Sequence, residues 1–224
     1  MTIFVLLRHA QSVANEQGVL AGRQEGVNLS KNGRSQARQV AKRFSKTSFD
    51  RIYSSPLERC LETVDELARL QGKRVVVDSA FVEMNYGEWS GKPLKDLSKK
   101  REWKQIQKHP SEFKFPKGES FSAAQRRVIK RLNELSEQPD KKILIVTHGD
   151  IIKLAVQSAL NGSLDDFQRI IVDPGSVCIL DWSPRERSVL HLNIPLSHEI
   201  ENSLTRYDKK SRAKRRVLGG GSGV

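Results

Sequence analysis

Two side chains suited to chemistry follow directly after the first apolar run of the sequence. Residues 3–7 read IFVLL, and Arg8 and His9 come next. An arginine is a permanent cation whose N–H groups match phosphate oxygens, and a histidine acts as a nucleophile or a base near neutral pH. If residues 3–7 form a buried strand, both side chains lie beyond its carboxyl end, where open α/β sheets bind ligands. The pair therefore predicts a site for an anion.

Three further reactive side chains follow predicted strands. Arg59 comes after a strand at 51–53 and a Ser-Ser-Pro turn, on the first turn of a predicted helix. Glu83 lies just past the third predicted strand, and His148 follows the strand predicted at 143–147. The carboxyl ends of parallel strands meet at one edge of a sheet, so we expect two arginines, two histidines and one carboxyl group to share a crevice.

This set of groups fits phosphoryl transfer through a covalent intermediate. An imidazole attacks phosphorus if its reacting nitrogen is unprotonated, and its other ring N–H then needs an acceptor. Guanidinium groups match phosphate oxygens and offset their charge in the transition state. A carboxyl group protonates the leaving oxygen and later takes a proton from water. The scheme requires no metal or other cofactor, so none is expected.

The motifs that hold these residues resemble the histidine phosphatase superfamily, also called the phosphoglycerate-mutase-like family. The resemblance spans residues 3–182. It implies that His9 is the nucleophile that becomes phosphorylated and that Glu83 donates the proton. The phosphate pocket that it implies consists of Arg8, Arg59 and His148. The motifs are residues 7–12 (LRHAQS) with Asn15, residues 54–59 (SSPLER), residues 83–91 (EMNYGEWSG) and residues 147–149 (THG), in the order of that family.

The resemblance also implies two further substrate contacts, while simpler roles stay open for several residues. Asn15 is implied as a phosphate contact, and Gly22 as a glycine near the bound substrate. Asn15 is equally compatible with a helix or turn cap. His148 could instead cap the helix that follows it, and Glu88 could replace Glu83 as the proton donor.

The sequence departs from the family pattern at two places. The family most often has glycine where this chain has Ala10, and alanine excludes the positive-φ conformations that glycine allows, so we expect an adjusted backbone with retained activity. Phosphoglycerate mutases usually read Glu-Arg-His-Tyr-Gly where residues 83–87 read EMNYG, so the arginine and histidine that help to hold a substrate carboxylate are missing. Residues 87–91 and 116–120 look like the phosphatase branch. Hydrolysis is therefore favoured over mutase activity.

Two other functions stay open from the sequence. A phosphomutase would need a sugar or glycerate bisphosphate to prime His9. A basic protein on the same fold would bind nucleic acid or another polyanion, and the formal net charge of +13 suits that function as well as an anionic substrate. The expected partner is a small phosphorylated metabolite, and nucleic acid is the alternative through a basic tail.

The alternation of short apolar runs with helical periodicity predicts an α/β sheet with helices packed on it. The resemblance implies a three-layer α/β/α fold with a mostly parallel central sheet. Ser30 is expected to be an N-cap, and Pro56 is expected at the first position of its helix. Strands are expected at 3–7, 51–53, 74–77, 143–147 and 176–181, with a weaker one at 189–192, and helices at 30–44, 56–70, 120–136 and 150–160.

The chain of 224 residues is long enough for one well-buried domain, expected at 1–200. Residues 84–118 contain scattered glycine, proline and aromatic residues, so loops and short helices at the rim of the site are expected there. Residues 201–224 are Gly-rich and carry seven Lys or Arg against two acidic residues, a balance of +5 that leaves +8 for the body. This tail is expected to be disordered and solvated, with a contact to nucleic acid, an acidic partner or the mouth of the site as the alternative.

The remaining composition is typical of a soluble globular protein. Cys60 and Cys178 are too few for a disulfide framework, and we interpret both as packed thiols. Trp89 and Trp103 are expected to be packing groups. Nothing at the amino terminus resembles a signal peptide, and no run of about 18 apolar residues could span a bilayer. A cytoplasmic protein without membrane contact is therefore expected.

Overall fold

Four neighbouring parallel strands dominate the six-stranded central sheet in the computed structural model, which describes residues 2–195. The strand order is β4-β3-β6-β1-β7-β8, and β7 runs antiparallel to both of its neighbours. All six predicted strands are confirmed within two residues at each end. Their bounds are β1 (Thr2–Arg8), β3 (Arg51–Ser54), β4 (Val75–Val77), β6 (Lys142–Thr147), β7 (Val177–Trp182) and β8 (Arg187–Ile194).

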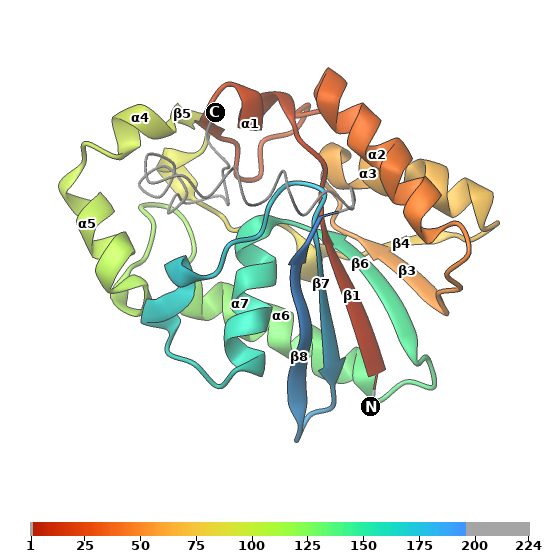
Figure 1. The fold of residues 1–224 in the computed structure, drawn as a ribbon. Coiled ribbons are helices and arrows are strands. Elements are labelled where there is room, and N and C mark those ends of the chain that lie inside the picture. Colours follow the sequence, from red (N-terminus) through yellow and green to blue (C-terminus); the bar gives the residue numbers. More distant parts are fainter. Residues whose placement is uncertain (1, 196–224) are drawn as a thin grey trace.

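Helices cover both faces of the sheet and complete three layers, which confirms the expected α/β/α fold (Figure 1). Successive side chains of a strand point to opposite faces, so β1 buries Leu7 with Val64 of α3 and Leu6 with Val128 of α6. A strand that is buried on both faces needs a continuous apolar run, as residues 3–7 provide. The covering helices are α2 (Lys31–Phe44) and α3 (Glu58–Leu70) on one face, and α6 (Phe121–Ser136) and α7 (Gly149–Ala159) on the other.

Ser30 is confirmed as the N-cap of its helix, whereas Pro56 does not take the position that was expected for it. Ser30 caps α2 and Ser120 caps α6, each through a side chain that accepts a backbone N–H of the first turn. The prediction that Pro56 takes the first helical position is wrong, because Leu57 is the N-cap of α3. Ser55 still donates its backbone N–H to a carbonyl of β6, so the chain leaves the sheet only there and needs Pro56 and Leu57 to turn before the helix begins.

Residues 84–118 form a rim layer beyond the sheet, at the upper left of Figure 1. They contain the expected short helices, α4 (Leu94–Leu97) and α5 (Arg101–Lys108), and one strand that was not expected, β5 (Lys92–Pro93). β5 pairs with β2 (Val19–Leu20), and two residues are too few to give an alternating pattern in the sequence. Trp89 is buried and stacks on Trp103 with the ring centroids 6.3 Å apart, so the interpretation of both as packing groups is confirmed.

Several other expectations concern the interior and the surface. Cys60 and Cys178 are both free and buried, as expected. Among residues 2–195, no helix is long and apolar enough to cross a bilayer.

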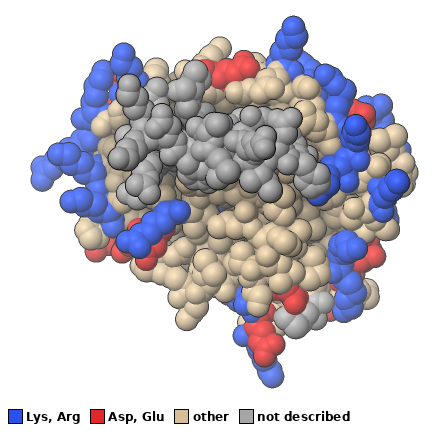
Figure 2. All heavy atoms as spheres, viewed as in Figure 1, with Lys and Arg blue, Asp and Glu red and all other residues tan. Residues whose placement is uncertain are grey.

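Figure 2 shows Lys and Arg side chains gathered over the α4–α5 side and over the α2–α3 side of the molecule. The predicted tail at 201–224 and the last residues of the predicted domain lie outside the described residues.

Candidate active site

The carboxyl ends of β1, β3 and β6 meet at one edge of the sheet. In the parallel register Arg8 of β1 pairs with Thr147 of β6, and β3 ends beside them at Ser54. His9 and His148 therefore leave adjacent strands at the same level, and their ring centroids lie 5.2 Å apart. In Figure 1 this edge is the upper end of the sheet, where β1 arrives from the amino terminus below.

Glu83 reaches the same edge through a short 3-10 turn, Ser79–Phe81, that follows β4. The hydroxyl of Thr147 donates to the carbonyl of Phe81 at 2.6 Å, which ties the turn to the end of β6. The carboxyl Oε2 of Glu83 lies 3.9 Å from Nδ1 of His148. The structure thus brings together five predicted residues, each at most 4% exposed as a whole residue: Arg8, His9, Arg59, Glu83 and His148.

The ring of His9 has one nitrogen fixed by the backbone. Nδ1 lies 2.7 Å from the carbonyl oxygen of Ala10. A carbonyl only accepts hydrogen bonds, so Nδ1 carries the proton and Nε2 of the neutral ring has a lone pair. Burial, reinforced by the cations Arg59 and Arg8, holds the pKa of His9 well below its usual value. His9 is therefore neutral near pH 7, and Nε2 carries the lone pair that a nucleophile needs.

Two buried guanidinium groups flank the histidines. Arg8 donates from Nη1 to the carbonyl of Val172 at 2.7 Å. Arg59 donates from Nη2 to the carbonyl of Gly22 at 2.7 Å and lies 3.3 Å from Nδ1 of His148. Its Nη1 is buried without a hydrogen-bond partner among the described residues. An unpaired donor on a buried cation is costly unless an anion completes it, so this atom fits a phosphate oxygen.

His148 is the N-cap residue of α7, but its side chain makes no capping hydrogen bond. The ring instead contacts Ser55, whose Oγ lies 2.7 Å from Nε2. Since Arg59 donates to Nδ1, Nε2 carries the proton and donates it to Ser55. Burial and then the cation Arg59 keep the pKa of His148 well below its usual value. The simple capping role is thus excluded for the side chain, which belongs to the buried cluster.

The carboxyl group of Glu83 is held in conditions that favour its protonated form. Burial, followed by the neighbouring carboxylate of Asp150, raises the pKa of Glu83 to about 7. Oε1 accepts the backbone N–H of Met84 at 2.9 Å, and the cations Arg59 and Arg8 act in the opposite direction. A carboxyl group with a pKa near neutrality can both give and take a proton at pH 7. Glu88, the alternative donor, is exposed and paired with Lys117.

Asn15 and Gly22 occupy supporting positions around this cluster. Asn15 accepts the backbone N–H of Ser12 at 3.0 Å through Oδ1, and Ser12 caps the short helix α1 (Val13–Glu16) in return, so the capping role is realised. Gly22 has a φ of +56° and presents its carbonyl to Arg59. A Cβ at this position would lie 2.6 Å from Oγ of Ser90, and the positive φ favours glycine whatever the space.

Ala10 fits its loop without the backbone conformation that glycine would allow. It is not among the described residues with positive φ, and its side chain is fully buried. Its N–H donates to the hydroxyl of Thr63 at 2.9 Å, and that hydroxyl donates to the carbonyl of Arg59 at 2.6 Å. The Ala10 backbone therefore ties the loop after β1 to the first turns of α3.

Sequence reasoning missed the groups that support Glu83. Asp150 is fully buried in α7 and accepts the hydroxyl of Tyr86 at 2.7 Å. On the other side, Arg23 donates to the carbonyl of Glu83 at 2.8 Å and pairs with Glu119 at 3.0 Å. Asp150 could have been identified from the sequence, because it follows the Thr-His-Gly motif directly. Arg23 and Glu119 lie in irregular segments far apart in the sequence, where periodicity gives no indication of contact.

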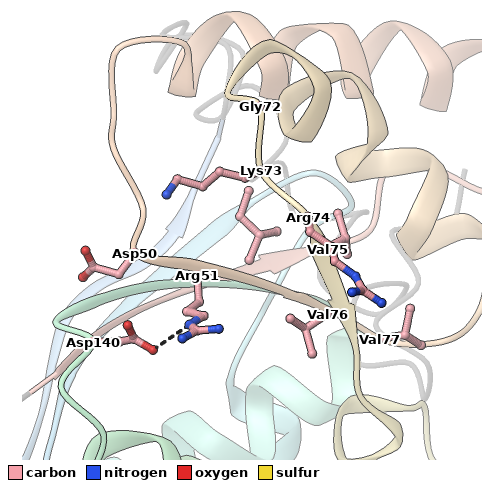
Figure 3. A pocket seen from close by; sticks show the side chains of 10 residues that line it. Asp50, Arg51, Gly72, Lys73, Arg74, Val75, Val76, Val77 and Asp140 are labelled. Atoms are coloured by element: carbon pink, nitrogen blue, oxygen red, sulfur yellow. Dashed lines mark hydrogen bonds and ion pairs between the residues drawn. The ribbon is translucent and has the colours of Figure 1, made fainter.

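Two features outside the cluster bear on ligand binding. Among the described residues, no group of three or more His, Cys, Asp or Glu is placed to hold a metal ion. An open hollow of about 870 Å³ lies beside β3 and β4 (Figure 3). Its charged residues include Arg51 at the amino end of β3, where it pairs with Asp140 at 3.1 Å. This hollow is therefore separate from the buried cluster at the carboxyl ends of the strands.

Comparisons with known proteins agree with the geometry. The sequence model of the histidine phosphatase superfamily (branch 1) matches residues 4–195. Phosphoserine phosphatase 1 of Hydrogenobacter thermophilus is 29% identical over 200 residues, covering 87% of this chain and 93% of that protein. Among solved structures, YhfR of Bacillus stearothermophilus superimposes with a TM-score of 0.80 at 23% identity, covering 88% of this chain and 99% of the other. A phosphoserine phosphatase of Entamoeba histolytica, solved with 3-phosphoglyceric acid, gives a TM-score of 0.75 at 25% identity, covering 87% and 98%.

Proposed function

Because the chain belongs to the histidine phosphatase superfamily and is a phosphatase, we propose that it hydrolyses small phosphomonoesters through a phosphohistidine at His9. The observation that carries this proposal is the hydrogen bond from Nδ1 of His9 to the carbonyl of Ala10. It leaves Nε2 unprotonated inside a buried cluster of two guanidinium groups. A neutral imidazole in a cationic pocket is the arrangement that nucleophilic attack on a phosphate dianion requires.

In the first step, Nε2 of His9 forms a bond to phosphorus as the ester P–O bond breaks. Arg8 and Arg59 bind the phosphoryl oxygens and offset their charge in the transition state. His148, fixed by Ser55, lies beside them and contributes to the same pocket. The products are the phosphohistidine and the alcohol, whose oxygen takes a proton from Glu83. Nδ1 keeps its hydrogen bond to Ala10, which stabilises the positive charge that develops on the ring.

In the second step, water attacks the phosphorus of the phosphohistidine. The carboxylate of Glu83, left without its proton by the first step, accepts a proton from the attacking water. The N–P bond breaks, His9 regains its lone pair, and inorganic phosphate leaves. A pKa of about 7 suits both halves of the cycle, since Glu83 must be protonated in one and ionised in the other.

Hydrolysis is supported over positional phosphate transfer by the residues that follow Glu83. Met84 is fully buried, and Asn85 accepts the backbone N–H of Gly87 at 2.9 Å through Oδ1. Neither supplies the cations that would hold a second substrate group for a mutase. The roles assigned to Asn15 and Gly22 as substrate contacts stay predictions, as does a cytoplasmic location.

A screen of phosphorylated metabolites tests the proposed function. Wild type is expected to release inorganic phosphate from one or more small phosphomonoesters, and His9→Ala is expected to release none above background. Retention of activity in His9→Ala would contradict the proposal. The same reactions, followed by NMR of the organic product, separate hydrolysis from transfer of phosphate to another hydroxyl.

A further inference from the structure

Arg23 is partly exposed and is fixed next to the proposed proton donor. Its Nε donates to the carbonyl of Glu83 at 2.8 Å, and its Nη2 donates to Glu119 at 3.0 Å. The side chain is 36% exposed, whereas that of Glu83 is 6% exposed. No hydrogen bond of Nη1 to a described residue is found, so one end of a guanidinium that is held at Nε and Nη2 keeps its donors unused.

The charge around Arg23 is positive. Glu119 uses one oxygen, Oε1, to bind Arg23, Arg127 at 3.1 Å and the backbone N–H of Asn85 at 2.8 Å. One carboxylate thus faces two guanidinium groups, and Arg127 also donates from Nη1 to the carbonyls of Ala80 and Val82. The excess positive charge at this point is available to an anionic group of a substrate.

One peptide unit, between Glu83 and Met84, separates Arg23 from the carboxyl group of Glu83. The carboxyl of Glu83 accepts the N–H of Met84, and Arg23 binds the carbonyl of the same peptide unit. An N–H and a C=O of a trans peptide point in opposite directions, so the two groups lie on opposite sides of the unit. With standard backbone dimensions, Oε1 of Glu83 and Nε of Arg23 are no more than about 8 Å apart. An anion bound by Arg23 therefore lies across this one peptide unit from the carboxyl group of Glu83.

Resting on the proposed phosphatase function, we propose that Arg23 binds a carboxylate of the substrate, so that the enzyme favours phosphomonoesters of small hydroxy acids. A planar carboxylate matches the open end of the guanidinium. The backbone connects Arg23 to the phosphate pocket, because the carbonyl of its neighbour Gly22 accepts a hydrogen bond from Arg59. One turn of chain thus positions the phosphate-binding and the carboxylate-binding groups together.

The test uses three pairs of substrates. Each pair consists of the phosphate ester of an ω-hydroxy acid, with one, two or three carbon atoms between the ester oxygen and the carboxylate, and its uncharged carboxamide. For at least one length, wild type is expected to show a kcat/KM about tenfold or more higher for the acid than for the amide, the gain of a hydrogen bond between charged groups. Arg23→Gln is expected to bring that ratio close to one, mainly through KM, and Arg23→Lys to give an intermediate ratio.

The control is Arg51→Gln, an exposed arginine with one carboxylate partner at the far end of the sheet. It is expected to keep the wild-type ratio. Equal losses for acid and amide in Arg23→Gln would mean that Arg23 only supports the Glu83 backbone, and would overturn the proposal. So would a wild type that shows no preference for the acid at any length. Failure of the proposed function is distinct, because it appears as phosphate release by His9→Ala on the amides, whatever the result at Arg23.

Discussion

Two cationic regions of the molecule differ in what surrounds their charges. At the carboxyl ends of the strands, Arg8 and Arg59 are buried and held by backbone carbonyls. In the hollow beside β3 and β4, Arg51 is 57% exposed at its side chain and pairs with the carboxylate of Asp140 (Figure 3). Water screens the second region, whereas the first acts at low dielectric, where a bound phosphate interacts far more strongly. Burial with fixed donors, rather than open volume, therefore distinguishes the proposed catalytic cluster from the hollow.

The comparison is tested most strongly by removing one guanidinium from each region at nearly constant volume. Arg59→Met is expected to lower kcat/KM for phosphate esters by about 10³-fold, because a fixed cation that offsets transition-state charge is lost. Arg51→Met is the matched control, and its kcat/KM is expected to stay at the wild-type value. Steady-state kinetics, with melting temperatures to confirm folding, provide the measurement. Similar losses of kcat/KM in the two variants would show that burial of the guanidinium group gives no catalytic advantage.

Proton donation by Glu83 gives the next largest expected effect. Glu83→Gln is expected to lower kcat/KM for alkyl phosphates by about 10²-fold or more, since an alkoxide leaves poorly without a proton. With p-nitrophenyl phosphate the loss is expected to be much smaller, because nitrophenolate leaves without protonation. The ratio of the two losses is the readout. Equal losses for both esters would assign Glu83 a role other than proton donation.

The buried position of Glu83 also predicts a dependence of stability on pH. Its pKa is about 7 when folded and near the ordinary carboxyl value when unfolded, so the folded state binds more protons between pH 4.5 and 7. Wild type should therefore lose stability relative to Glu83→Gln as the pH rises through this window, by about 3 kcal/mol in total. The histidines titrate in both proteins, so their contributions largely cancel in the difference. Urea unfolding at pH 4.5 and pH 8 measures it, and a difference that does not grow with pH would contradict the buried, protonated carboxyl.

The smallest effect is expected in the exposed region. A triple change of Arg51, Lys73 and Arg74 to glutamine removes the cations that line the hollow. At about 0.15 M salt their field is screened beyond roughly 8 Å, so kcat/KM should change by less than about twofold. A tenfold or larger loss of kcat/KM at this salt concentration would show that the hollow takes part in substrate binding. Burial would then not be what distinguishes the two regions.

The same contrast explains which parts of the molecule the sequence predicts. The strands and the residues at their ends were predictable, because residues 3–7 and 143–147 are continuous apolar runs and Arg8, His9 and His148 follow them directly. Their meeting at one edge follows from parallel pairing. The shift of the α3 start past Pro56 was not predictable, since it depends on Ser55 extending the ladder with β6.

The support around Glu83 shows why the remaining site was not predicted. Arg23 and Glu119 are 96 positions apart, and both lie in segments without helical or strand periodicity. Their pairing depends on how the rim folds over the sheet, which local patterns do not encode. Asn15 shows a different limit of sequence-based prediction. The sequence allowed both a capping role and a phosphate contact, and in the structure Asn15 makes the capping hydrogen bonds.

The central claim is that His9 becomes phosphorylated during turnover. Wild type is mixed with excess phosphate ester, quenched within one turnover in denaturing base, which preserves a phosphohistidine, and analysed by intact mass and peptide mapping. A protein heavier by one phosphoryl group, with the group on His9 and absent from His9→Ala, is the expected result. Release of phosphate with no phosphorylated protein at any quench time, or with the group on another residue, would contradict the proposed mechanism.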